Sequence, residues 1–512
     1  MHKYTKRIYN LLSSKGFSLF IVLFFIFESA WIAVSAAFPQ AFDEDYHFGI
    51  IKIYSHHIFP FLNSQPFGAN VFGALVRDPS YLYQYLMSFP YRLISYLTPD
   101  QLTQVIFLRF INIGLVVICL FLFYKLIRKT GVSKILTNII LLLFILIPIV
   151  PQLSAQINYD NLLLPLIAWT LLLSLRVIDQ IRSHKPSFRS LASLLIIGLF
   201  SSLVKYVYLP IFLAIIIFLT IVLIKNYRKN IGLYFKGVLT SFKKESKVIK
   251  TILILLLILS IGMFIQRDVV NLIKYHNVAP NCSLVMSTKA CSAYGPWEYN
   301  DISHKTLIET KSHGHNPIQG PIYYTKQWLY WMWFRLFFAI NGPQSSYANY
   351  PPLPLPSAAS LIIFAAGIVI FIKYWKKIFK DNIYLLLLFS TSIFYVLVLY
   401  LQGYASYRYT NVLENMNGRY LLPVILPLVA VFAKGYSVAL RKHQNIKVIL
   451  AVIVLVLFLE GGGLFTFIER SDDTWDIPNK TVRQLNNSAR HLTEPIIING
   501  NKYYWTNTWF FN

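Results

Sequence analysis

The sequence predicts an all-α integral membrane protein with about eleven transmembrane helices. Of its 512 residues, 56% are hydrophobic and only 13% are charged, and a water-soluble domain has too little interior to hide that much apolar surface. Apolar runs of roughly 17 to 22 residues recur along the chain, each near the length that crosses ~30 Å of hydrocarbon. These runs are residues 18–37, 104–124, 134–150, 159–175, 190–204, 208–224, 250–266, 355–372, 383–401, 420–437 and 448–468.

The net charge of +26 is unevenly distributed, and its distribution predicts the topology. Six short connecting segments hold 28 of the 47 Lys and Arg residues: 1–17, 125–134, 176–189, 225–250, 373–380 and 434–447. The positive-inside rule places these segments in the cytoplasm, with the N-terminus inside and the C-terminus outside. Nucleic acid is not an expected partner, because it would require a basic, groove-shaped soluble surface.

Three outer segments are large enough to build a site: 38–103, 267–354 and the tail from 469. The first contains the short aromatic run YLYQYLM, which predicts helices lying in the membrane interface. The second contains Cys282 and Cys291, and an oxidising compartment would permit a disulfide between them. The sequence leaves that pairing open.

Chemically reactive side chains gather directly after the first apolar run. Asp43, Glu44, Asp45 and His47 lie within five positions. Carboxylates this close repel one another and raise one another's pKa unless a cation, a metal ion or a hydroxyl substrate shares the site. A solvated acidic loop and a functional site are both consistent with this pattern.

Four motifs resemble GT-C membrane glycosyltransferases. The stretch FDEDYHFG at 42–49 is similar to the Asp-Glu motif that opens the first outer loop of that superfamily, and to protein O-mannosyltransferases with one residue inserted before the histidine. The stretch RDPSYLY at 77–83 resembles the loop with a Pro-Pro-Leu-Tyr pattern, with Ser80 replacing the second proline. SAQINYDN at 154–161 and NGRYLLP at 417–423 are similar to motifs of a related bacterial membrane family.

The resemblance implies a sugar transfer that uses a polyprenyl-phosphate donor. Asp43 would be the general base, and Glu44 and His47 would orient that base or the acceptor. Arg419, with Lys205 as a partner, would stabilise the charge of the leaving phosphate. The remaining substrate-binding candidates are Arg77, Asp78, Asn158, Asp160 and Tyr420.

Several of these residues also have simpler explanations. Asn158 and Asp160 could be helix caps, Lys205 could be a snorkelling lysine, and Arg419 could anchor its helix at the interface. Some GT-C enzymes use a divalent ion, so a metal held by Asp43 and Asp45 is a further expectation. No nucleotide-binding fingerprint occurs in the sequence.

We expect an inverting transfer to a glycan, lipid or protein acceptor, in a bacterial cytoplasmic membrane, with the active site outside. A surface-polysaccharide polymerase or ligase, or a flippase or transporter for lipid-linked glycans, are the alternative functions. The expected organisation is a GT-C-like module over 1–266 that includes the outer loop 38–103, then the outer loop 267–354, C-terminal membrane helices over 355–468, and an outer tail over 469–512.

Overall fold

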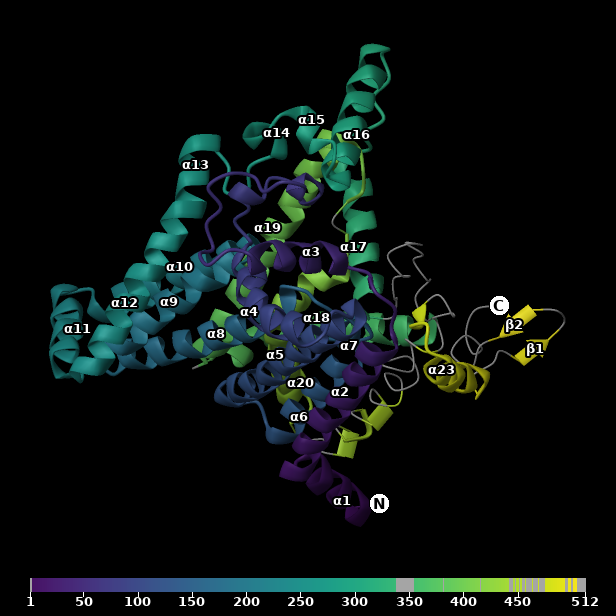
Figure 1. Cartoon of the computed structure of the whole chain (residues 1–512). Helices are drawn as coiled ribbons and strands as arrows, with labels where there is room; N and C mark the ends of the chain where they lie inside the picture. Colours follow the sequence, from purple (N-terminus) through teal and green to yellow (C-terminus); the bar gives the residue numbers. More distant parts are fainter. Residues whose placement is uncertain are drawn as a thin grey trace.

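The computed structural model describes residues 2–337 and 354–441 apart from 381 and 415, scattered positions between 445 and 468, and 475–492, 496–498 and 501–503. This part of the chain is almost entirely helical (Figure 1). The helices of the first half are α1 (His2–Leu12), α2 (Lys15–Ser35), α3 (Glu44–Ser55), η1 (Ala69–Phe72), η2 (Leu75–Arg77), α4 (Leu82–Leu97), α5 (Gln101–Lys129), α6 (Lys134–Leu146), α7 (Ile149–Ser154), α8 (Asp160–Arg182), α9 (Phe188–Val204), η3 (Tyr206–Tyr208), α10 (Leu209–Tyr227), α11 (Gly232–Lys244), α12 (Lys247–Phe264), the π-helical turn η4 (Ile265–Val269) and α13 (Val270–Tyr275).

The described residues of the second half form fewer elements. They are α14 (Cys282–Val285), α15 (Thr288–Cys291), α16 (Gly295–Ser312), α17 (Pro321–Phe337), α18 (Pro354–Phe379), α19 (Ile383–Thr410), η5 (Gly418–Leu421), α20 (Leu422–Ala439), α23 (Lys480–Leu492), β1 (Ile496–Ile498) and β2 (Asn501–Tyr503). The two strands form an antiparallel pair in which Ile497 lies opposite Lys502.

Seven segments of the described chain are long and apolar enough to cross a membrane: Lys15–Ser35, Gln101–Lys129, Asp160–Arg182, Tyr206–Tyr227, Lys247–Tyr275, Ile383–Thr410 and Gly418–Ala439. Lys134–Leu146 and Phe188–Val204 are shorter apolar helices. The predicted all-α membrane fold is therefore confirmed, and the protein is an integral membrane protein. The total of about eleven spans stays a prediction, and most of the predicted run 448–468 lies outside the described residues.

Polar residues mark where the apolar helices begin. Ser14, Asp100, Ser133, Ser187 and Ser246 are N-caps whose side chains accept a hydrogen bond from the backbone N–H three residues later. Such caps satisfy backbone donors that the first helical turn leaves without a partner. The core of the bundle forms where α5 packs along α8, α8 along α9 and α2 along α5, while α20 packs between α18 and α19.

The first outer loop contains the helices α3 and α4, with the short turns η1 and η2 between them. That these helices lie in the membrane interface stays a prediction. α3 packs against α4, and α4 also contacts α5. Above them, the disulfide between Cys282 and Cys291 joins α14 to α15 (Figure 1). The open question of that pairing is thus answered.

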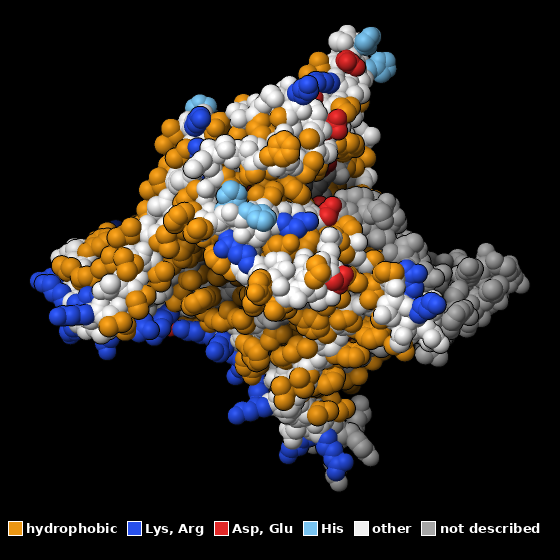
Figure 2. Space-filling model, viewed as in Figure 1, with side chains coloured by type: hydrophobic (Ala, Val, Ile, Leu, Met, Phe, Trp, Pro, Cys, Tyr) orange, Lys and Arg blue, Asp and Glu red, His pale blue; other side chains and the backbone are white. Residues whose placement is uncertain are grey.

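The tail lies at the same end of the bundle as the loop that follows α2. Asp476 pairs with Ala36 in an antiparallel bridge, and Ile477 N donates to Ser35 O at 2.8 Å. Arg490 of α23 forms an ion pair with Asp476 at 2.8 Å. On the face shown in Figure 2, Lys and Arg side chains line the lower left edge and the lower tip and also occur higher up, while most visible Asp and Glu side chains lie in the middle and upper parts.

Candidate active site

Asp43 lies directly before α3, at a strained point of the backbone. Phe42 and Asp43 both have a left-handed conformation with φ of 68°, which costs a residue with a side chain roughly 1–2 kcal/mol. The Phe42 carbonyl is held by two donors, Asn158 Nδ2 at 2.9 Å and Arg419 Nη1 at 3.2 Å. Strain that surrounding contacts impose in this way is typical of functional sites.

The carboxylate of Asp43 forms an ion pair with Arg419, whose Nη2 lies 3.0 Å from Asp43 Oδ2. The Asp43 side chain is 46% exposed, whereas that of Arg419 is 8% exposed. Burial alone would raise the pKa of Asp43, but the charge and hydrogen bond of Arg419, with smaller contributions from His47 and Lys205, lower that pKa below its ordinary value. The predicted approach of Asp43 and Arg419, 376 positions apart, is confirmed.

The residues around Arg419 explain its fixed position. Asn417 Oδ1 accepts a hydrogen bond from Arg419 N at 3.0 Å, which caps η5. Gly418 packs so tightly against α17 that a Cβ there would lie 2.3 Å from Leu336 N, so no larger residue fits. The guanidinium lies over the ring of Tyr420, 5.2 Å from its centroid. The Gly-Arg-Tyr motif therefore has a clear structural basis.

A second buried ion pair lies beside the first. Lys205 Nζ is 2.7 Å from Asp160 Oδ1, and both side chains are nearly inaccessible to solvent. Lys205 Nζ also lies 4.2 Å from the ring centroid of Tyr159 and 5.3 Å from that of Tyr420. Burial lowers the pKa of Lys205, while the charge of Asp160 opposes this effect. Asp160 N in turn donates to Asn158 Oδ1 at 3.0 Å.

His47 is buried next to these pairs. Its ring makes an edge contact with Tyr159 at 4.4 Å between centroids. The side-chain nitrogen of Gln84 donates to the carbonyls of Ser80 at 2.8 Å and Tyr81 at 3.3 Å. The side-chain oxygen of Gln84 therefore faces His47 Nδ1 at 3.1 Å and accepts a hydrogen bond from it, so Nδ1 carries the proton. Burial lowers the pKa of His47 to about 3, despite the opposing charge of Asp43. The imidazole is therefore neutral at physiological pH.

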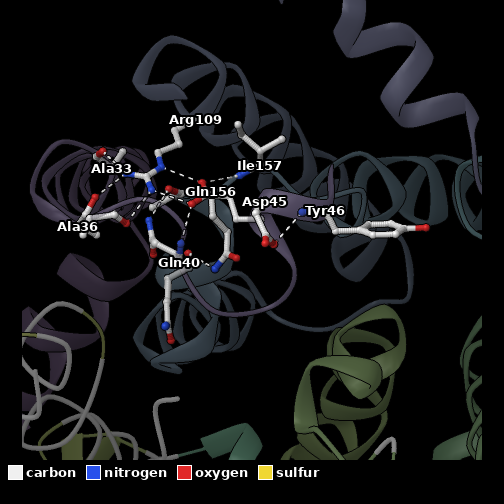
Figure 3. A network of polar contacts seen from close by, with 12 residues as sticks. Ala33, Ala36, Gln40, Asp45, Tyr46, Arg109, Gln156 and Ile157 are labelled. Atoms are coloured by element: carbon white, nitrogen blue, oxygen red, sulfur yellow. Dashed lines mark hydrogen bonds and ion pairs between the residues drawn. The ribbon is translucent and has the colours of Figure 1, made fainter. Parts of the chain in front are cut away.

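Glu44 has a different environment from Asp43. Its carboxylate accepts from Arg109 Nε at 2.8 Å, Arg109 Nη2 at 2.7 Å, Gln40 N at 2.8 Å and Ile157 N at 3.1 Å (Figure 3). Glu44 and Arg109 both have fully buried side chains. Glu44 therefore cannot touch an acceptor, and its predicted role narrows to orienting Asp43 through the start of α3.

Arg109 extends the same network to the end of α2. Its Nη1 donates to Ala33 O at 2.9 Å and Ala36 O at 2.7 Å, and its Nη2 donates to Ala37 O at 3.1 Å. Our sequence predictions missed Arg109, although a cation inside an apolar helix is an expected sign of a buried polar contact.

Arg77 and Asp78 are neighbours in the sequence, but their side chains lie in different surroundings. Asp78 Oδ1 accepts from Ser80 N at 2.9 Å, and burial raises the pKa of Asp78. Its charge acts on Tyr46 and Tyr294, so Asp78 borders the Asp43 site. Arg77 instead donates to Gln266 O in η4 at 3.4 Å, so we give it no place in the cluster around Asp43.

Tyr294, from the outer segment between α15 and α16, also reaches this site. Its ring lies 6.1 Å from that of Tyr46 and packs on Gly73, where an added Cβ would be 3.1 Å from it. Burial raises the pKa of Tyr294, and the charges of Asp43 and Asp78 add to this effect. Nothing in the local sequence distinguishes this tyrosine from the 33 others.

The metal ion expected at Asp43 and Asp45 stays a prediction. None of the His, Cys, Asp and Glu side chains of the described residues form a group of three or more that could hold a metal ion. Asp45 is exposed, and its Oδ1 accepts from Tyr46 N at 2.7 Å. A metal at Asp43 and Asp45 would therefore lack a third protein ligand of this kind among the described residues.

The site draws on several separated parts of the chain: the first outer loop, the junctions before α8 and after α9, the residue Tyr294 directly before α16, and η5. Residues 38–276 match the family model of the dolichyl-phosphate-mannose-protein mannosyltransferases. That family is part of the GT-C superfamily, so the predicted resemblance to GT-C enzymes is confirmed over this segment. A search of curated proteins finds no match to the chain. The matched segment contains Asp43, His47, Asp160 and Lys205, whereas Arg419 reaches these residues from outside it.

Proposed function

We propose that the chain transfers a sugar from a polyprenyl-phosphate donor to an acceptor hydroxyl on the non-cytoplasmic face, with inversion of the anomeric centre. The ion pair between Asp43 and Arg419 supports this most directly, because it joins a base and a phosphate-binding cation within reach of one substrate. The acceptor is a glycan, a lipid or a protein.

In this mechanism one bond forms as another breaks. Asp43 accepts the proton of the acceptor hydroxyl, and the hydroxyl oxygen attacks the anomeric carbon. The bond between that carbon and the phosphate oxygen breaks, and the polyprenyl phosphate leaves with the electron pair. A single displacement of this kind inverts the anomeric configuration.

Donor binding would activate the base. In the structure Arg419 lowers the pKa of Asp43, which makes its carboxylate a weak proton acceptor. A donor phosphate offers Arg419 a doubly hydrogen-bonded partner. When Arg419 turns to the phosphate, burial would raise the pKa of Asp43, so that Asp43 becomes a stronger base only when the donor is present.

The neighbouring residues would assist Asp43 and Arg419 in this reaction. Lys205 lies on the same tyrosine ring as Arg419, that of Tyr420, and would add a second positive charge for the leaving phosphate. Asp160 holds Lys205 in place through their ion pair. Asn158 holds the Phe42 carbonyl in place through a hydrogen bond. Asp78 would bind sugar hydroxyls, and neutral His47 would orient the acceptor.

The substitution Asp43→Asn tests the proposal. It keeps the size of the side chain but removes its ability to accept a proton, so transfer should fall at least about 10²-fold. The assay uses membranes that contain the full-length chain, a radiolabelled polyprenyl-phosphate sugar pool and the native acceptor mixture. Undiminished transfer by Asp43→Asn would overturn the assignment.

The matched control is Asp100→Asn. Asp100 caps α5 by accepting from Thr103 N at 2.8 Å, and asparagine caps helices equally well, so this variant should transfer normally. An inactive Asp45→Asn variant beside an active Asp43→Asn variant would identify Asp45 as the base instead.

The metal at Asp43 and Asp45 remains a separate proposal. Treatment with EDTA, followed by addition of Mg²⁺ or Mn²⁺, tests it in the same assay. Loss of transfer that either ion restores would support the proposal, and unchanged transfer after chelation would refute it. We further propose a bacterial cytoplasmic membrane as the location, with the N-terminus inside and the C-terminus outside.

A further inference from the structure

A cavity of about 690 Å³ lies at the end of the bundle opposite Asp43. Arg419 lies just before α20, whereas Lys434 and Arg441 lie near or after its other end. The 18 residues of α20 rise about 27 Å at roughly 1.5 Å each, so the cavity and the candidate active site are nearly one hydrocarbon thickness apart.

The lining of this basic cavity is strongly cationic. Lys377 lies in the last turn of α18 and Lys380 directly after that helix, while Lys434 lies in α20 and Arg441 two residues after its end. The lining residues that the structure describes include no Asp or Glu. The positive-inside rule explains why cations lie at this end, but it does not require four of them to line one cavity.

The groups beside these cations in the described lining are neutral, so the cations are available to pair with an anion. Lys434 Nζ has a long contact of 3.4 Å with the carbonyl of Gly131. Asn382 also lines the cavity, and its side chain is fixed by donating to Thr130 O at 2.8 Å. Ser133 and Ser437 add hydroxyl groups to the lining. Four cations with hydroxyl and amide donors are a set that suits a phosphate group.

An apolar groove of about 210 Å³ continues from the basic cavity. The two share Leu136, Ile139 and Ser437 in their linings. The groove lies between α6, α18 and α20, and on α20 its lining extends from Leu440 to Ile425. Those 15 steps along the helix rise about 22 Å, which exceeds the depth of one leaflet, about half of ~30 Å.

We propose that the basic cavity and the apolar groove bind one anionic phospholipid. Its phosphate would lie among Lys377, Lys380, Lys434 and Arg441, and one acyl chain would fill the groove. The cytoplasmic leaflet, where the topology places this end, is rich in anionic lipids that attract Lys and Arg. At about 22 Å the groove is long enough to hold one acyl chain, which spans about one leaflet, but too short to enclose a much longer polyprenyl chain. This inference does not depend on the proposed function.

Native mass spectrometry of the purified full-length chain tests this site. Wild-type protein should retain one phosphatidylglycerol more tightly than phosphatidylcholine. The double variant Lys377→Gln/Lys434→Gln should bind phosphatidylglycerol at least about tenfold more weakly, since each lost cation near the membrane surface weakens binding to an anionic lipid. Equal binding of both lipids to wild type, or an unchanged double variant, would overturn the proposal.

Control variants distinguish lipid binding at this site from nonspecific attraction of anionic lipid to positive charge. Lys244→Gln/Lys247→Gln removes two exposed cations from α11 and α12, and this variant should bind like wild type. Arg441→Gln changes an exposed residue of the cavity, so it tests the site if the double variant does not fold. An equal loss of lipid in the α11/α12 control would point to nonspecific charge attraction and refute the site.

Further ligands distinguish the possible occupants. Dioctanoyl phosphatidylglycerol should bind more weakly than the dioleoyl form, because its short chains fill less of the groove. Inorganic phosphate at equal concentration should not displace the lipid. Displacement by phosphate would overturn the lipid assignment, and tighter binding of a polyprenyl phosphate would overturn the assignment to a phospholipid.

Discussion

Asp43 and Glu44 are consecutive residues, yet their carboxylates bind arginines from different parts of the chain. Asp43 pairs with Arg419 at the edge of the site, whereas Glu44 pairs with Arg109 inside the bundle. The left-handed conformation of Phe42 and Asp43 accompanies this divergence. One carboxylate is accessible to a substrate, and the other fixes the segment that carries it.

The buried ion pair between Glu44 and Arg109 should contribute strongly to the free energy of unfolding. Arg109→Leu leaves the Glu44 carboxylate buried without its cation, so the free energy of unfolding should fall by about 3–5 kcal/mol. Glu44→Gln should be less harmful, because Arg109 keeps its three carbonyl acceptors. Thermal unfolding of the purified variants in detergent is the measurement. The double variant should lose less than the sum of the single losses, and strict additivity would contradict direct coupling.

Removal of Arg419 should change the pH dependence of transfer. In wild type its charge lowers the pKa of Asp43, so Asp43 stays ionised in acid. In Arg419→Gln only the smaller contributions of His47 and Lys205 still oppose the effect of burial, so the pKa of Asp43 rises. The acidic limb of kcat/KM should therefore move to higher pH, with transfer also reduced at least tenfold. Lys52→Gln, an exposed α3 variant with the same charge loss, is the control. An unmoved acidic limb would show that Asp43 does not govern it.

His47 should make the fold sensitive to acid. Its pKa is about 3 in the folded chain and about 6.5 when unfolded, so below pH 6.5 the unfolded state binds a proton that the folded state does not. The free energy of unfolding should therefore fall by about 1.4 kcal/mol per pH unit as the pH decreases from 6.5 towards 3. In His47→Gln this part of the decrease should vanish. Unfolding curves at pH 7, 6 and 5 provide the comparison, and parallel decreases in both proteins would contradict a neutral, buried His47.

Tyr294 should affect the acceptor more than the donor. Tyr294→Ala removes the ring that packs on Gly73 and Tyr46, so the KM for the acceptor should rise severalfold while Tyr294→Phe remains close to wild type. Cys291→Ser should have a similar effect, because the disulfide restrains the segment three residues before Tyr294. Tyr299→Ala, at an exposed position of α16, is the control. A rise in donor KM alone would assign Tyr294 to the other substrate.

The sequence predicted the helices well because apolar run length reports directly on bilayer crossing. It also placed Asp43 and Arg419 in one site, since the motifs around them resemble those of one superfamily. The different environment of Glu44 could not be predicted, because it depends on two unusual backbone conformations. Arg109 gave a signal, but its partner 65 positions away did not follow from it. Tyr294 reaches the site only through the folded outer segment, so no local pattern reveals it.

The ion pair between Asp43 and Arg419 also bears on how the protein is made. At roughly 5–20 residues per second, the 376 positions between them take about 20–75 s to synthesise. During that time the segment that matches the family model can enter the membrane while Arg419 has not yet been made. A nascent or truncated chain would then carry Asp43 without the arginine that lowers its pKa, and, if the proposed roles of the two residues hold, transfer would begin only after Arg419 had also been inserted.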